Sequence, residues 1–238
     1  YLYKMLDNLY KSEYNINKTT RGSIMKKSVY SVVLADDVIA KVDKLAYLNS
    51  TNRSNMINQI LAEYVSLVTP EKRISSIFDE LARQLYAGET FSELSPPTSS
   101  VMSVRTALSY KYNPTVKYSI ELYREPEHTQ GVIKVSTRTT NPTLLSKMLE
   151  FYNAWAELEY AYGFTGKDTF ENGVFKRPII YRENRLAGKG AKRGLSAGEL
   201  IADYVYLLDS AMKMYFSDSI DEIRPTYEDY IRQNSEII

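Results

Sequence analysis

The sequence contains no cysteine and only one histidine among its 238 residues. Without cysteine the chain has no disulfide, no thiolate nucleophile and no cysteine-based zinc finger. The single imidazole, His128, lies in a polar turn, where a solvated side chain is favoured over a base or a ligand. A transition-metal site built from nitrogen and sulfur ligands is therefore disfavoured. Because no catalytic constellation stands out either, we predict no enzymatic activity, no metal and no cofactor.

The sequence also lacks a strong net charge and a long apolar run. Its formal net charge is +1, so any affinity for nucleic acid must come from local patches and from several copies acting together. No segment reaches the roughly 18 apolar residues of a membrane span, and no secretory signal is visible. We therefore expect a cytoplasmic protein without membrane contact. With 44% hydrophobic residues, the chain is long enough for two domains.

One short alternating segment, residues 28–34, is followed by two amphipathic helical patterns. Side chains separated by two positions share a face of a β-strand. One face carries Tyr30, Val32 and Leu34, and the other carries Val29, Ser31 and Val33. Asp36 or Asp37 is then available to cap a first helix ending near Leu48, and Ser54 to cap a second one ending near Val68.

The predicted strand has no neighbouring strand in its own chain with which to pair. Unpaired backbone groups are costly, and even an isolated two-stranded hairpin is marginal in water. We therefore expect the strand to pair with the same strand of a second copy. Tyr30, Val32 and Leu34 would then lie in a shared dimer core.

The segment from Met25 to Val68, with its strand, its apolar frame and its polar entry NRSN into the second helix, resembles a ribbon-helix-helix domain of the Arc, MetJ and CopG type. This likeness covers about one fifth of the chain. In that family two strands form an antiparallel ribbon that enters the DNA major groove. The resemblance implies base-facing positions at Val29, Ser31 and Val33, and phosphate contacts at Lys27, Arg53, Ser54 and Asn55.

The chain departs from the family pattern at the base-facing positions. Two of the three residues are valine, whereas major-groove readout usually uses side chains that form hydrogen bonds. Valine can still pack on thymine methyl groups, and serine can donate or accept. The alternative is that protein covers both strand faces and the unit only dimerises.

The rest of the sequence predicts an α+β fold. Residues 1–24 are expected to be a peripheral or disordered extension, either an upstream segment or a cloning remnant, with Met25 as a natural start. Residues 25–88 form the ribbon-helix-helix domain with an extra helix after Thr69-Pro70, and residues 89–100 have linker composition. Residues 101–238 form a domain of dimerising or sensing role. Strands are expected at 101–112, 116–124, 132–139 and 174–182, and helices at 143–162, 196–216 and after Pro225. The expected product is an antiparallel sheet covered by helices.

A cationic stretch, GKGAKRGLS, occupies residues 188–196. It lacks the ending of a nucleotide-binding phosphate loop. Lys189, Lys192 and Arg193 are candidates for additional phosphate-backbone contacts, although a solvated loop is the simpler interpretation.

Together these features predict a sequence-specific DNA-binding regulator, a transcriptional repressor, acting on double-stranded DNA as a homodimer or higher homo-oligomer. One alternative is a plasmid partition or chromosome-organising DNA-binding protein. Others are a dimeric interaction protein that does not bind DNA and an antitoxin. The operator and any small-molecule effector are undefined by the sequence.

Overall fold

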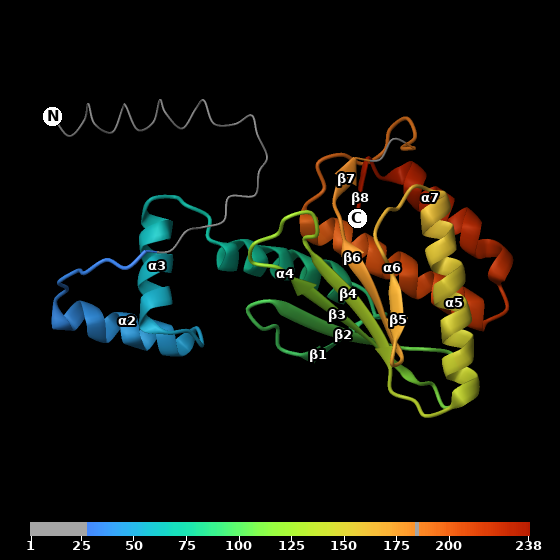
Figure 1. Cartoon of the computed structure of the whole chain (residues 1–238), viewed down its shortest axis with the longest axis horizontal. Helices are drawn as coiled ribbons and strands as arrows, with labels where there is room; N and C mark the ends of the chain where they lie inside the picture. The colour runs from blue at the N-terminus through green and yellow to red at the C-terminus, as the bar shows by residue number, and fades with distance from the viewer. Residues whose placement is uncertain (1–27, 184–185) are drawn as a thin grey trace.

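The computed structural model describes residues 28–183 and 186–238, which form a small helical unit joined to a larger α/β unit (Figure 1). Residues 28–35 have no regular secondary structure and lead into α2 (Asp36–Leu48) and α3 (Arg53–Tyr64). The extension expected at residues 1–24 lies outside the described residues. In the described part, no helix combines the length and apolar character needed to cross a membrane.

The predicted starts of α2 and α3 need correction. Ala35 occupies the N-cap of α2 without a side-chain bond, so the two aspartates lie in the first turn, where they complement the helix dipole. Asn52, not Ser54, caps α3, because its side chain accepts a hydrogen bond from the backbone N–H of Asn55 at 2.9 Å. The α2–α3 turn therefore closes two residues earlier than expected.

Helix α4 (Pro70–Tyr86) belongs to the larger unit rather than to the N-terminal domain in which we expected it. Its start agrees with the prediction: Pro70 is in the first turn and Thr69 accepts a hydrogen bond from the Lys72 N–H at 3.2 Å. Its apolar stripe, however, is buried in the same core as the sheet and the C-terminal helices. The stripe consists of Ile74, Phe78, Leu81 and Leu85. The two hydrophobic cores therefore separate before α4, not after it.

The larger unit contains a six-stranded antiparallel sheet, in the order β1-β2-β3-β4-β6-β5. Its strands are β1 (Ser92–Ser95), β2 (Val101–Ala107), β3 (Thr115–Leu122), β4 (Gly131–Thr137), β5 (Thr169–Glu171) and β6 (Val174–Ile179). The antiparallel sheet with helices confirms the predicted class at that level. Residues 89–100 are not a free linker, because β1 pairs with β2 and Phe91 is buried in the core.

Alternation along the strands divides the sheet into a buried and an open face. In β3 the side chains of Tyr118, Ile120 and Leu122 are buried, while Lys117 and Glu121 point to the other face. Strand β2 ends earlier than predicted because residues 108–114 form the connecting turn, in which Tyr112 and Asn113 have positive φ.

Helices cover the buried face of the sheet. Besides α4, they are α5 (Pro142–Ala161), α6 (Ala197–Phe216) and α7 (Ile223–Gln233), the last preceded by the 3-10 turn η1 (Ile220–Glu222). Figure 1 shows α4 and α6 behind the sheet and α5 along its β5 side. Helix α6 begins with a capping box: the Ser196 hydroxyl accepts from the Glu199 N–H, and the Glu199 carboxylate accepts from the Ser196 N–H. Two short strands, β7 (Arg182–Glu183) and β8 (Glu236–Ile237), close the C-terminal end.

A buried ion pair joins α5 to the sheet. The Arg177 guanidinium, on β6, donates to both carboxylate oxygens of Glu159 at 2.8–3.0 Å and to the Ile238 carbonyl at 2.7 Å. The rings of Phe164 and Tyr204 lie on either side of it, each 3.9 Å from the guanidinium carbon. The Tyr204 hydroxyl donates to Glu159 at 3.0 Å. This network fixes α5, α6 and β6 relative to one another.

Candidate nucleic-acid interface

The segment predicted to form the ribbon is an exposed apolar stretch in the single chain. Residues 28–34 are in no strand, and no β-pairing in the described part of the chain includes them. Val29 is 99% exposed and Val33 100% exposed, whereas Leu34, on the predicted core face, is 38% exposed. The segment is neither paired within its own subunit nor helical, so the geometry leaves it available for a second chain.

The two helices that follow share a small core. Val42, Ala46 and Met56 are buried together with Ile57 against them. Many other large apolar side chains of this unit stay exposed. They include Tyr30, Val32, Val38, Leu45, Tyr47, Leu48, Ile60, Leu61, Tyr64, Val65, Leu67 and Val68. Exposed large apolar side chains in such number on one small unit favour an interaction site over a free monomer.

The α2–α3 turn holds Arg53 against α2. Its guanidinium makes two parallel hydrogen bonds to the Asp43 carboxylate, at 2.7 and 2.6 Å. The hydrogen bond and the positive charge of Arg53 lower the pKa of Asp43 below its ordinary value. Both side chains remain about half exposed, so the guanidinium is accessible from solvent at its outer edge.

The other predicted phosphate contacts are only partly available. Ser54 lies exposed in the first turn of α3, where backbone N–H groups and the helix dipole favour an anion. The Asn55 N–H is already bonded to the Asn52 side chain, which corrects the expectation that this amide is free. Lys27 lies outside the described residues. Arg53 and Ser54 therefore remain the accessible candidates near this turn.

The loop with the additional cations lies on the larger unit and is tied to the C-terminal segment. Lys192 pairs with Asp203 at 3.6 Å, and its backbone N–H donates to the Gln233 carbonyl at 2.8 Å. Lys189 and Arg193 are exposed and make no ion pair among the described residues. The loop is thus anchored through its backbone, while the Lys189 and Arg193 side chains are exposed to solvent.

Sequence reasoning missed three structural residues near these sites. Asn52 is a favoured N-cap residue type at the end of the turn before α3, but we assigned the cap to Ser54. The Asp43–Arg53 pair spans ten residues and has no local signature. Arg177 could have been found, because it falls on the same alternating face as the buried Phe175 and Ile179.

Metal chemistry has no candidate among the described residues, where no group of three or more His, Asp or Glu side chains gathers to hold an ion. Comparisons of the sequence with protein-family models and curated proteins, and of the structure with solved structures, gave no match. The interpretation of the chain therefore depends on its own residues.

Proposed function

We propose that the chain is a DNA-binding transcriptional regulator that works as a dimer, with residues 28–34 of two copies forming an antiparallel ribbon. The observation that carries this proposal is the exposed apolar segment of residues 28–34 directly before two helices with a very small common core. An extended chain pairs its backbone groups by adding a second strand, and apolar side chains leave water in the same step.

The exposure pattern along the segment supports the proposed register. Leu34, Val32 and Tyr30, on the face assigned to the dimer core, are 38%, 71% and 83% exposed, whereas Val29 and Val33 on the opposite face are 99% and 100% exposed. A one-residue slip would exchange these faces, so the hydrophobic pattern itself selects the pairing. The outward face would then meet the major groove, where Val29 and Val33 pack on thymine methyl groups and Ser31 forms hydrogen bonds.

The start of α3 supplies the phosphate contact in this proposal. Arg53 is anchored by Asp43 and presents the remainder of its guanidinium to solvent beside the first turn of the helix. An anchored guanidinium loses little side-chain entropy when it meets an anion. A duplex backbone at this position would therefore be held by Arg53 together with the helix N-terminus.

The test uses two variants that break the same ion pair from opposite sides. Arg53→Ala removes the cation, and Asp43→Asn removes its partner but keeps the cation. Under this proposal Arg53→Ala weakens binding to DNA fragments selected from random duplexes, and it lowers the slope of log affinity against log salt by about 0.9 per lost phosphate contact, or about 1.8 for a dimer. Asp43→Asn leaves that slope unchanged.

If both variants bind DNA like the parent, the phosphate role of Arg53 is wrong. If both weaken binding equally without a change of slope, the pair serves only to hold α2 against α3. Dimerisation is measured separately by sedimentation of Val32→Asp, which buries an unpaired carboxylate in the proposed core and is expected to give a monomer.

A dimeric interaction protein that does not bind DNA is the second candidate. Two observations favour it: the outward face carries two valines, and the Arg53 guanidinium is already paired within the chain. This candidate predicts a stable dimer with no selected DNA fragment at all. A partition or chromosome-organising protein would instead protect a long, spreading footprint on DNA rather than one operator-sized site.

A further inference from the structure

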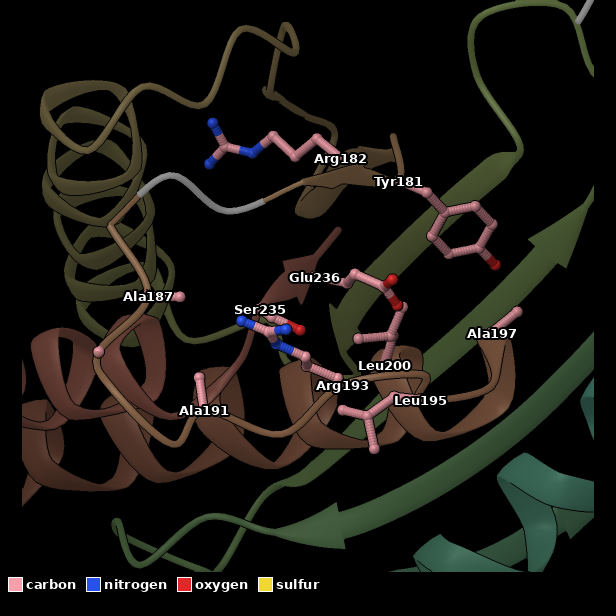
Figure 2. A pocket seen from close by; sticks show the side chains of 11 residues that line it. Tyr181, Arg182, Ala187, Ala191, Arg193, Leu195, Ala197, Leu200, Ser235 and Glu236 are labelled. Carbon is pink, nitrogen blue, oxygen red and sulfur yellow. The ribbon is translucent and has the colours of Figure 1, made fainter.

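A cavity of about 780 Å³ opens beside the C-terminal segment of the larger unit (Figure 2). Cavities of a few hundred to about 1,000 Å³ are the usual size of small-molecule sites. Its walls come from four separate segments: residues 181 and 182 at the start of β7, the loop 186–196, the first turn of α6, and residues 235 and 236 at the start of β8. The lining includes Tyr181, Arg182, Arg193, Leu195, Leu200 and Glu236.

Backbone hydrogen bonds hold the loop wall of this cavity in place. The Gly188 N–H donates to the Arg232 carbonyl at 2.9 Å, and the Ser235 N–H donates to the Lys192 carbonyl at 3.0 Å. Gly188 allows this approach, since a Cβ there would lie 3.2 Å from the Arg232 carbonyl oxygen. The wall is therefore formed before any ligand arrives, which reduces the entropy lost on binding.

Three charged side chains line the cavity, Arg182, Arg193 and Glu236, and the Arg182 guanidinium donates to the Gly163 carbonyl. Neither Arg193 nor Glu236 makes an ion pair or a side-chain hydrogen bond among the described residues, and no ion pair joins the two. Glu236 alternates along β8 with the buried Ile237, so the carboxylate faces the cavity side of the strand. Figure 2 shows the Glu236 carboxylate and the Arg193 guanidinium around the same space.

Apolar side chains form the rest of the cavity lining. Leu195, Ala197 and Leu200 line the cavity next to the start of α6, and the ring of Tyr181 lines it near Glu236. The Tyr181 hydroxyl is buried without a hydrogen-bond partner among the described residues. Burial raises the pKa of Tyr181 to about 12, so the hydroxyl stays protonated and can donate.

We propose that this cavity binds a zwitterionic small molecule of the amino-acid class, with its carboxylate on Arg193, its ammonium group on Glu236 and its apolar side chain on Leu195 and Leu200. The opposite charges on the two residues select for a ligand that carries both. The volume accommodates a free amino acid or a dipeptide, which share this chemistry.

A ligand at this place also has a route to the N-terminal unit. The first turn of α6 lines the cavity, and α6 packs against α4, which follows α3 after five residues. A regulatory effect on DNA binding rests on the proposed function above, whereas ligand binding itself does not. The two are therefore tested separately, with binding measured on the full chain without DNA.

Calorimetric titration of the full chain with L-leucine, L-phenylalanine and the dipeptide Leu-Leu tests the ligand class. N-acetyl-leucine, which lacks the ammonium group, and leucinamide, which lacks the carboxylate, are the matched controls. Losing a charged hydrogen bond lowers affinity by about 10- to 100-fold, so each blocked compound is expected to bind that much more weakly than leucine. The ratio of leucine to Leu-Leu affinity distinguishes the free amino acid from the dipeptide.

Two charge variants and one filling variant locate the site. Arg193→Gln and Glu236→Gln are each expected to lower affinity about 10-fold or more, whereas Arg138→Gln and Glu127→Gln, at exposed positions outside the cavity, leave it unchanged. Ala191→Phe places a ring in the cavity from the loop wall and is expected to abolish binding. Circular dichroism confirms that each variant is folded.

Three results overturn the proposal. The first is that none of the three zwitterions binds at millimolar concentration. The second is that blocked and free compounds bind equally. The third is that binding survives Ala191→Phe and both charge variants, which places the ligand elsewhere. None of these results bears on DNA binding, and loss of DNA binding in Arg53→Ala leaves the cavity proposal untouched.

Discussion

Removing Arg177 tests the energetic role of the buried ion pair. Arg177 and Glu159 are 1% and 0% exposed, and the guanidinium donates to Glu159, to Ile238 and to the Pro178 carbonyl at 3.2 Å. In Arg177→Met the carboxylate keeps only the Tyr204 hydroxyl among these donors. Breaking a buried pair from one side costs about 3–5 kcal/mol, because an uncompensated charge stays in the interior.

The double variant Arg177→Met with Glu159→Met provides the decisive comparison. It removes both charges. The Ile238 carbonyl then loses the Arg177 donor and the Tyr204 O–H loses the Glu159 acceptor, which costs about 1–3 kcal/mol for each unsatisfied group. Because the buried charge is gone and two apolar side chains fill the space, part of this cost is recovered. We therefore expect the single variant to be less stable than the double variant by about 1–2 kcal/mol.

Urea unfolding followed by tryptophan fluorescence measures both values. The chain has a single tryptophan, and Trp155 donates a 2.9 Å hydrogen bond to Tyr204 within the same network, so its emission reports this core. The slope of stability against urea should be the same in all variants if the transition stays two-state. A single variant that loses less than about 1 kcal/mol, or that is no weaker than the double, refutes the reasoning.

Three further outcomes follow from other residues. Burial and the neighbouring Glu159 carboxylate raise the pKa of Asp168 to about 7, so the folded state holds a proton that the unfolded state releases above about pH 4. The free energy of unfolding should therefore fall as the pH rises from 4 to 7. Asp168→Asn should remove up to about 1.4 kcal/mol per pH unit of that dependence, as measured by urea unfolding at several pH values. Gly131→Ala places a Cβ 2.1 Å from the Glu121 carbonyl oxygen and should lower the free energy of unfolding by about 3 kcal/mol or more. Gly190→Ala has open space around the new Cβ but a φ of +86°, and it should lower the free energy of unfolding by about 1 kcal/mol. Similar shifts of the melting temperature for the two variants would contradict this difference. Leu81→Ala, at a fully buried position of α4, should lower the free energy of unfolding by about 2–5 kcal/mol and shift the urea midpoint reported by Trp155 to lower urea, and an unchanged midpoint would show that α4 is not part of that core.

Local patterns predicted β2, β3, β4, β6 and the helices α4 to α7, because the signals for each of them lie within a few residues, whereas β1, β5, β7 and β8 were not predicted. Period-two burial in β3 and the capping signals at Thr69 and Ser196 required only neighbouring positions. The four exposed residues of β1 have no such alternation. That strand is held by pairing with β2, which its own residues do not signal, and we therefore predicted a linker over residues 89–100.

Membership in a core is less predictable than the element itself. The apolar stripe of α4 predicts that one face of the helix is buried, but it does not predict whether α3 or α6 covers that face. The same limit applies to Arg177, whose burial depends on Glu159 eighteen residues away and on ring stacking from two other segments. For the candidate DNA interface, the sequence provides the alternation of residues 28–34. The strand pairing that this alternation predicts involves a second copy of the chain.

The short connection between α3 and α4 has a consequence for assembly. Five residues, 65–69, span at most about 17 Å when fully extended. If two N-terminal units pair, each larger unit is tethered within that reach of the pair, and the local concentration of one larger unit near the other rises into the millimolar range. A very weak contact between the larger units would then be enough to lock the whole assembly into a fixed two-fold arrangement.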